Sequence, residues 1–319
     1  MFRQLEMCSL AFALREGKQM KETLRYMKRN WVLYLMLLVP IVYILLFKYL
    51  PMFGTLIAFQ DYNIFEGILG SDWVGLEHFK EAFANKDFWR AFKNTIVLNV
   101  GSLIVGFPVP IILAIFLNEV TSPRIKKSTQ LILYLPHFLS WVIIAGIIQQ
   151  LFSGTGMVNE MLMAMGIDKV NFLGNGSNWR WIYWLSGVWQ GAGYSMIVYL
   201  SSLTAIDTSL YEAAYLDGAG RFQRIWYITV QMIRPTITVM LIMQLGKIVA
   251  IGFEKPYLMG NVLVKDVADV LSTHVYVVGL ESGRFDYATA IGLFQSVVGI
   301  IMVLLSNWIS KKFGEEGLI

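Results

Sequence analysis

The residues best suited to chemistry lie together in the stretch EAAYLDGAGRF, residues 212–222, between two long apolar segments. Glu212 and Asp217 supply carboxylates, Arg221 supplies a guanidinium, and Gly218 lies between the charged positions. The stretch holds no nucleophile beside a base and no metal-ligand spacing, so it predicts no covalent or metal catalysis. Charged groups and glycine in one short connection instead favour recognition by another protein.

A short helix is predicted at the start of this stretch. Ser209 and Glu212 have the spacing of a capping box, so the helix should begin at Ser209. Ala213 and Ala214 give it a small, smooth face, and Gly218 predicts a sharp turn before a second, basic helix. A helix this short is not stable alone and needs a partner surface. We therefore expect a helix–turn–helix plug that docks into another protein.

The composition indicates which elements must position this plug. Hydrophobic residues make up 56% of the 319 residues and the mean hydropathy is +0.56, which leaves too little polar surface for a soluble globule. Apolar windows long enough to cross a hydrocarbon core of about 30 Å occur at about 31–50, 94–117, 131–152, 181–203, 236–253 and 287–309. The sequence therefore predicts an all-α polytopic membrane protein with six transmembrane helices and a transmembrane domain over 31–309.

Basic residues predict the orientation of these helices. Lys and Arg are concentrated in 1–30, 118–130, 204–235 and 310–319. Acidic residues outnumber basic ones when 51–92, 153–180 and 254–286 are taken together. The tails 1–30 and 310–319 and the connection 205–235 are therefore expected on the cytoplasmic side. We interpret the basic tail 1–30 as a topology signal, with binding of anionic lipid as the alternative.

Prolines and histidines add two expectations. Pro40, Pro108, Pro110 and Pro136 each remove a backbone donor inside a predicted span, so kinks or broken helices are expected there. The histidines match no metal-ligand spacing, and no metal site is predicted; they are His78, His137 and His274.

The connection resembles a known motif. The pattern Glu212-Ala213-Ala214-x-x-Asp217-Gly218-Ala219, followed by Ile228 and Pro235, is similar to the EAA loop of importer-type ABC permeases. In that family the loop is the coupling helix that fits a groove on the ATP-hydrolysing subunit. The family usually has a proline near the end of the loop, where this chain has Gln231, and we expect a softer turn into the fifth span.

The resemblance covers nearly the whole chain. The stretches that carry it are Phe47–Phe59, WVGLEHF at 73–79, YLPHFLS at 134–140, YATAIGLFQSVV at 287–298 and KKFG at 311–314. They look like the carbohydrate, maltose-permease-like branch, and within it the group for complex or polysaccharide-derived oligosaccharides. The resemblance implies a MetI-like permease fold in a bacterial cytoplasmic membrane. It also implies partners: a second homologous permease chain, two ATPase subunits, an extracytoplasmic sugar-binding protein and an oligosaccharide, but no nucleic acid.

The energy for transport is then expected from a partner subunit. The sequence contains no G-x-x-x-x-G-K-[ST] phosphate loop, so the chain is not expected to be an enzyme or to hold a cofactor. ATP and Mg²⁺ are expected on the partner ATPase. The docking residues implied by the motif are Glu212, Ala213, Ala214, Asp217, Gly218 and Arg221. An ion-pair network among the charged members on a solvated loop is the alternative reading.

In this family the helices flanking the loop line the pathway. On the fifth span Gln244, Lys247 and Glu254 are expected on one helical stripe. Lys247 lies twelve residues after Pro235, about 18 Å into the membrane, so it should face protein or water. Two roles stay open for Lys247. It could contact the substrate together with Gln244, or it could pair with a carboxylate such as Glu254.

The fourth span adds side chains suited to sugar. Trp189, Gln190 and Tyr194 combine aromatic faces with hydrogen-bonding groups, and we place them in the substrate pathway. The tryptophans nearer the outer boundary, Trp179, Trp181 and Trp184, are assigned to an interfacial belt.

Two questions stay open at this point. A substrate contact by Lys247 would favour acidic, uronate-containing oligosaccharides, although a neutral glycan can also accept from its ammonium. The principal alternative to an ATP-driven importer is an ion-coupled secondary transporter that uses Lys247 and Glu254. A membrane enzyme has less support because no catalytic constellation gathers at one face.

Overall fold

The computed structural model describes residues 26–312 and divides into two units, with the boundary between residues 56 and 57. The first unit carries α2 (Trp31–Ile44), the π-helix η1 (Leu45–Tyr49) and most of the 3₁₀ segment η2 (Leu50–Phe59). These elements form an apolar stretch of 29 residues, long enough to cross a membrane. Pro40 lies inside α2, which continues to Ile44. Most of the predicted basic tail lies outside the described residues.

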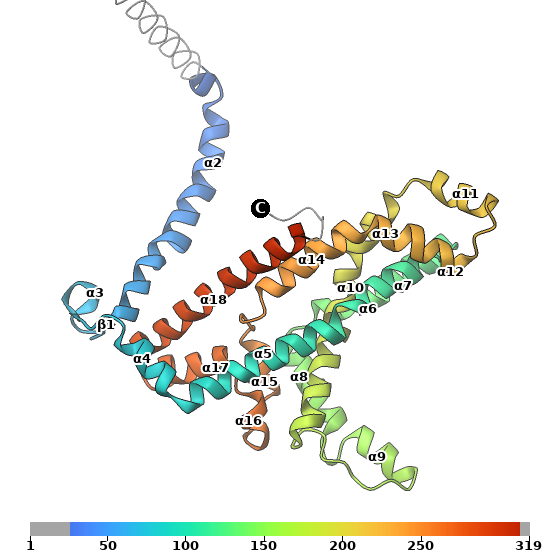
Figure 1. Cartoon of the computed structure of the whole chain (residues 1–319). Coiled ribbons are helices and arrows are strands. Elements are labelled where there is room, and N and C mark those ends of the chain that lie inside the picture. Colours follow the sequence, from blue (N-terminus) through green and yellow to red (C-terminus); the bar gives the residue numbers. More distant parts are fainter. Residues whose placement is uncertain (1–25, 313–319) are drawn as a thin grey trace, which may run out of the picture. The chain divides into compact units, whose positions relative to one another are not determined.

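The second unit is almost entirely helical (Figure 1). A two-residue antiparallel ladder joins β1 (Gln60–Asp61) to β2 (Asp72–Trp73) around α3 (Gly67–Gly70). The helices before the loop are α4 (Glu77–Ala84), α5 (Lys86–Gly106), α6 (Pro108–Asn118), α7 (Pro123–Tyr134), η3 (Leu135–Phe138), α8 (Trp141–Phe152), α9 (Met157–Ala164) and α10 (Gly176–Thr204). Those that follow are α11 (Thr208–Leu216), α12 (Arg221–Arg224), η4 (Ile225–Thr229), α13 (Val230–Met232), α14 (Arg234–Gly246), α15 (Glu254–Met259), η5 (Val262–Val264), α16 (Lys265–Ala268), α17 (Leu271–Tyr276), η6 (Val277–Glu281) and α18 (Phe285–Lys312).

The predicted spans correspond to described helices. Four stretches have the length and apolar composition to cross a membrane: Trp31–Phe59, Lys86–Asn118, Trp141–Ala164 and Phe285–Lys312. A fifth is the pair Arg221–Met232 and Arg234–Gly246, bent by 59°. The window 181–203 falls in α10, whose 29 residues extend about 44 Å. Its Ser, Gly, Gln and Trp content makes it less apolar than the other spans.

The prolines interrupt helices at two of the predicted places. α5 ends at Gly106 and α6 begins at Pro108, because Pro108 and Pro110 cannot donate to the preceding turn. Pro136 lies in η3, after which Leu139 turns to extended backbone and Ser140 caps α8. The window 131–152 is therefore a broken segment made of α7, η3 and α8.

Three apolar clusters hold the second unit together. In the first, Trp179 is fully buried and its indole N–H donates to the Met259 carbonyl at 2.8 Å. The interfacial-belt assignment of Trp179 is therefore wrong, since its ring packs inside the bundle. The second cluster packs α6, α10 and α14 together, and the third joins α5 to α17 and α18.

A polar clamp ties the start of α18 to α4. Arg284 donates two hydrogen bonds to the Glu81 carboxylate at 2.9 and 2.7 Å. The Arg284 guanidinium holds the pKa of Glu81 below its usual value. Both side chains remain well exposed, so the clamp orients the helix end more than it stabilises the fold.

Candidate functional site

The connection between α10 and α14 forms two short helices, α11 and α12, as predicted. The start of α11 differs from the predicted one. Its N-cap is Asp207, whose carboxylate accepts from the Ser209 N–H at 2.9 Å. These hydrogen bonds from Ser209 hold the pKa of the Asp207 carboxyl below its usual value. The predicted cap at Ser209 is therefore wrong, because a carboxylate two residues earlier already satisfies the helix terminus and suits its dipole.

The far end of α11 closes in a Schellman motif. Gly218 has φ +81°, its N–H donates to Tyr215, and the Ala219 N–H reaches back to Ala214 at 2.9 Å. Gly218 is the residue that this left-handed turn requires. Gly220 then precedes α12, and its N–H donates to the Gln223 side chain at 2.8 Å. The turn between α11 and α12 is thus fixed by hydrogen bonds on both sides.

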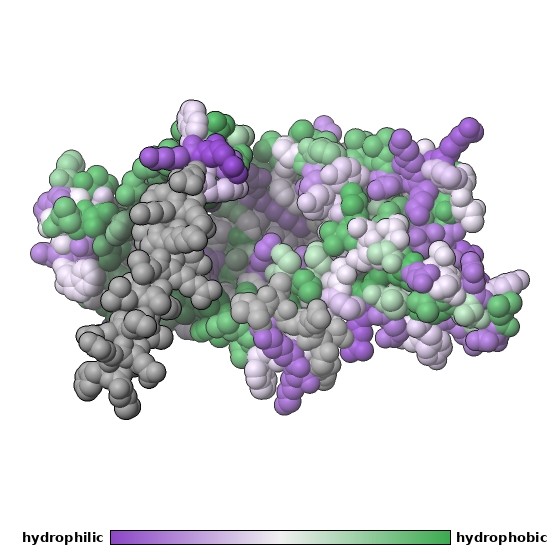
Figure 2. All heavy atoms as spheres, turned by 90° about the horizontal axis from the view of Figure 1, so that it is seen from above, coloured by the Kyte–Doolittle hydropathy of each residue, from purple (hydrophilic) through white to green (hydrophobic). Residues whose placement is uncertain are grey.

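The predicted docking residues lie on an accessible surface. Glu212, Ala213, Asp217, Gly218 and Arg221 are exposed, and Ala214 is half-buried. Two large apolar side chains join them, since Leu216 is 84% and Phe222 77% exposed. Hydrophobic residues cover much of the face in Figure 2, and they mix with hydrophilic ones at the right-hand end, where Figure 1 places α11 and α12.

The plug is braced against the bundle. Arg221 Nε donates to Glu119, just after α6, at 2.7 Å, and the hydroxyls of Tyr211 and Thr229 are 3.0 Å apart. No ion pair joins Glu212 or Asp217 to a neighbour among the described residues. The alternative of a loop-internal ion-pair network is therefore wrong, because Arg221 reaches across to Glu119.

The plug continues into the fifth span through a sharp bend. Arg221–Met232 and Arg234–Gly246 meet at 59°. The fully buried Ile233 lies at this junction, and Pro235 follows in the first turn of α14. Gln231 lies before the bend, within α13.

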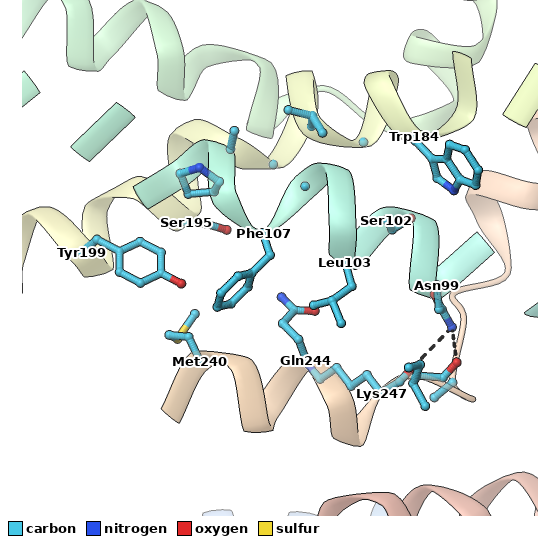
Figure 3. Close-up of a pocket in the computed structure, with 18 residues that line it drawn as sticks. Asn99, Ser102, Leu103, Phe107, Trp184, Ser195, Tyr199, Met240, Gln244 and Lys247 are labelled. Atoms are coloured by element: carbon cyan, nitrogen blue, oxygen red, sulfur yellow. Dashed lines mark hydrogen bonds between the residues drawn. The ribbon is translucent and has the colours of Figure 1, made fainter. Parts of the chain in front are cut away.

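A cavity of about 330 Å³ lies between α5, α6, α10 and the end of α14 (Figure 3). It contains two of the predicted pathway residues, Gln244 and Lys247. The polar and aromatic side chains that line it are Asn99, Ser102, Phe107, Trp184, Ser195, Tyr199, Gln244 and Lys247. Phe107, at the break between α5 and α6, lies between Tyr199 and Gln244 in this view.

Lys247 lies where the fifth span stops being helical. α14 ends at Gly246, so the predicted stripe from Gln244 to Glu254 is wrong, and Glu254 begins the separate helix α15. The Asn99 amide donates to the carbonyls of Ile248 at 2.8 Å and Lys247 at 3.4 Å. Gln295 donates to Val249 in the same way, at 2.9 Å. Amides from α5 and α18 thus satisfy carbonyls that a continuing helix would have used.

The ammonium of Lys247 is exposed in the isolated chain. Within residues 26–312 no carboxylate lies within ion-pair distance of it. The predicted pairing with Glu254 is therefore absent from the described part of this chain.

None of the three pathway residues predicted on the fourth span lines this cavity. Trp189 lines a separate apolar groove against α8, Tyr194 stacks on His137 at 4.2 Å, and Gln190 is not a lining residue. Trp184 does line the cavity, so its assignment to the belt is wrong. The reason is helical phase, because Trp184, Gly187, Gly191 and Ser195 share a face from which positions 189 and 194 turn away.

Sequence reasoning missed Asn99, Tyr199 and Lys255. Asn99 could have been found from the sequence, since it is a polar residue inside an apolar window. The Lys255 ammonium lies 3.8 Å from the Tyr183 ring centre and 4.8 Å from that of Trp141. No cluster of metal-ligating side chains occurs among the residues that the structure describes.

Comparisons with known proteins show the family of the chain. Residues 106–314 match the family model described as "Binding-protein-dependent transport system inner membrane component". The polygalacturonan/rhamnogalacturonan transport system permease protein YteP of Bacillus subtilis (strain 168) is 48% identical over 90% of this chain and 89% of its own.

Two solved structures are also similar. A chain of a bacterial ABC transporter involved in the import of the acidic polysaccharide alginate has a TM-score of 0.83 and 43% identity, over 90% of this chain and 98% of that one. A chain of an alginate ABC transporter in complex with an alginate pentasaccharide-bound periplasmic protein has a TM-score of 0.84 and 42% identity, over 92% of this chain and 99% of that one.

Proposed function

The chain belongs to the family of binding-protein-dependent transport system inner membrane components and is the permease of an ABC importer for oligosaccharides. We propose that a separate ATPase drives it and that it carries acidic sugars. The exposed plug α11–α12 docks into a separate ATPase, which binds ATP and Mg²⁺. A second, homologous permease chain completes the pathway. An extracytoplasmic binding protein delivers the sugar, and both termini lie in the cytoplasm.

The observation that supports docking is the construction of the plug. A capped α11, a glycine turn and the Arg221–Glu119 contact make a rigid element, while Leu216 and Phe222 remain uncovered. Exposed apolar side chains on a rigid element are typical of an interface. Glu212 and Asp217 are available to the ATPase because neither is paired within the described part of the chain.

We propose that the cargo is acidic. Lys247 lies at the cavity beside the hydrogen-bonding groups of Gln244 and Asn99, and its ammonium has no carboxylate partner among residues 26–312. An unpaired cation inside a membrane bundle gains most from an anionic partner. Similar permeases serve polygalacturonan, rhamnogalacturonan and alginate transport, so oligosaccharides containing uronate are the proposed substrate class.

ATP dependence tests the first part of the proposal. The complete complex in proteoliposomes is expected to take up oligogalacturonate only with ATP, binding protein and ATPase present. Gly218→Pro removes the N–H that donates to Tyr215 and forbids positive φ, so it is expected to weaken ATPase association and abolish uptake. Uptake at the wild-type rate in that variant would contradict the docking role.

The charge of the cargo needs a separate measurement. Lys247→Gln keeps a hydrogen-bond donor and removes the charge, so it is expected to lower kcat/KM for an acidic oligosaccharide about tenfold, or about 1.4 kcal/mol. Uptake of the carboxyl-reduced, neutral oligomer should change less than twofold. Equal losses for both oligomers would remove the charge argument. Uptake driven by an ion gradient without ATP would instead support a secondary transporter.

A further inference from the structure

Lys255 is a second unusual cation, in the helix that follows the break after α14. It lies in the first turn of α15, and its ammonium packs over the rings of Tyr183 from α10 and Trp141 from α8. Tyr183 is buried, so its ring face is shielded from solvent. Cation–π contacts of this kind hold a cation without neutralising its charge.

No acidic partner explains this position. Among residues 26–312, no carboxylate lies within ion-pair distance of Lys255, and no hydrogen bond from its ammonium is found. The residue keeps part of its surface exposed and its Nζ is not one of the sealed polar atoms. The ammonium therefore keeps some accessible surface.

Gly187 connects this lysine to the cavity. A Cβ atom built on Gly187 would lie 2.5 Å from Lys255 Nζ, so the ammonium rests against the bare backbone of α10. Gly187 also lines the cavity that contains Lys247. The Lys255 ammonium thus lies against a residue of α10 that also lines this cavity. Any residue larger than glycine would displace the ammonium.

We propose that Lys255 is a second cationic determinant of the sugar pathway, held beside Gly187 so that it favours oligosaccharides carrying carboxylates over neutral ones. The inference rests on the proposed oligosaccharide import and adds a residue that acts with Lys247. A uronate carboxylate supplies the charge that both ammonium groups lack among the described residues. Two cations along one pathway would retain an anion more selectively than one.

The test measures the selectivity of the complete reconstituted complex for trigalacturonate over its carboxyl-reduced, neutral form. Lys255→Gln is expected to lower the ratio of the two kcat/KM values about tenfold, whereas Lys255→Arg should keep it within about threefold. Gly187→Ala leaves the lysine in place but displaces its ammonium, and it should lower the same ratio. This second variant keeps the test valid if Lys255→Gln fails to assemble.

Two controls match these variants. Lys265→Gln removes an exposed lysine of α16, and Gly292→Ala adds a methyl group in α18 where nothing lies within 4 Å. Both should keep the wild-type ratio. An unchanged ratio in Lys255→Gln, or equal losses for both sugars, would overturn the inference while leaving import intact. Failure of the wild-type complex to take up either sugar with ATP would instead overturn the proposed function.

Discussion

At the scale of single residues, the position of Lys247 depends on its neighbours more than on its own helix. α14 ends one residue before it, and the Asn99 amide holds the carbonyls of Lys247 and Ile248. The Lys247 carbonyl also accepts from the Ala250 N–H at 2.9 Å. The Ile248 carbonyl depends on Asn99, and leaving it unsatisfied at membrane depth would be costly. Asn99 is therefore a positioning residue that fixes the point where the ammonium enters the cavity.

Asn99→Leu tests this role. The substitution keeps the number and branching of the side-chain heavy atoms and removes the donor, so the Ile248 carbonyl loses its partner at about 1–3 kcal/mol. We expect the KM for an acidic oligosaccharide to rise about fivefold or more, with a smaller change in kcat. Gln295→Leu removes the donor to Val249, which does not line the cavity, and should raise KM less. An equal rise in both variants would mean that the break as a whole matters and that Asn99 has no special role.

Some cavity residues are predictable from sequence and others are not. Gln244 and Lys247 are polar residues in an apolar window, which is a strong signal, and both line the cavity. Trp189 and Tyr194 have suitable chemistry but lie on other faces of α10, against α8 and His137. Which face of an apolar helix meets the pathway is decided by its neighbours, and one sequence does not show them.

At the scale of elements, α11 and α12 behave as one rigid piece. Asp207 caps the start of α11, and the Schellman turn at Gly218 closes its end. An isolated helix of nine residues would be marginal in water. The caps of α11 and the Tyr211–Thr229 contact therefore stabilise a helix that is too short to be stable alone. A rigid piece can pass a partner's displacement into the bundle, whereas a flexible loop would absorb it.

The two glycines of the plug offer a matched pair of variants. Gly218→Ala places a Cβ at φ +81°, where an L-residue is disfavoured by about 1–2 kcal/mol. Gly220→Ala is made at φ −67°, and the new Cβ finds its nearest neighbour at an ordinary 3.6 Å. We expect Gly218→Ala to weaken binding of the ATPase subunit about five- to thirtyfold, and Gly220→Ala to change it less than twofold. Equal binding by the two variants would show that the left-handed turn is not needed.

At the scale of the whole second unit, one apolar cluster connects the plug to the cavity. Tyr211 of α11 and Ile228 of η4 pack against a buried core that includes Ile233 and Tyr199. Tyr199 also lines the cavity. Close-packed side chains transmit displacement because they leave little free volume. The cluster is the physical route by which movement of the plug can reach the sugar pathway.

Much of this architecture follows from the sequence. Hydropathy predicts the apolar spans, and each predicted window has helical counterparts. The prolines predict kinks or breaks at Pro40, Pro108 and Pro136; helices are interrupted at Pro108 and Pro136, whereas α2 continues past Pro40. The end of α14 at Gly246 was not predicted, because it depends on amides from α5 and α18. Periodicity along one chain carries no record of such contacts.

The contact between Arg221 and Glu119 leads to a prediction about coupling. Arg221 is 68% exposed and Glu119 27%, so the pair adds only about 0–1 kcal/mol to stability. Variants at either position should therefore fold and assemble. Arg221→Glu places two carboxylates against each other and pushes α12 away from the end of α6. We expect the complex to keep hydrolysing ATP while sugar uptake per ATP falls several-fold.

The charge-swapped double variant decides between bracing and docking. If the pair braces the plug, Arg221→Glu combined with Glu119→Arg restores the attraction and should recover most of the uptake per ATP. If Arg221 instead binds the ATPase directly, the second substitution cannot replace that contact, and coupling stays low. Measuring uptake and ATP hydrolysis in the same proteoliposomes separates these outcomes. A bracing role for the Arg221–Glu119 pair predicts recovery, because the attraction requires opposite charges at the two positions and is the same when the charges are exchanged.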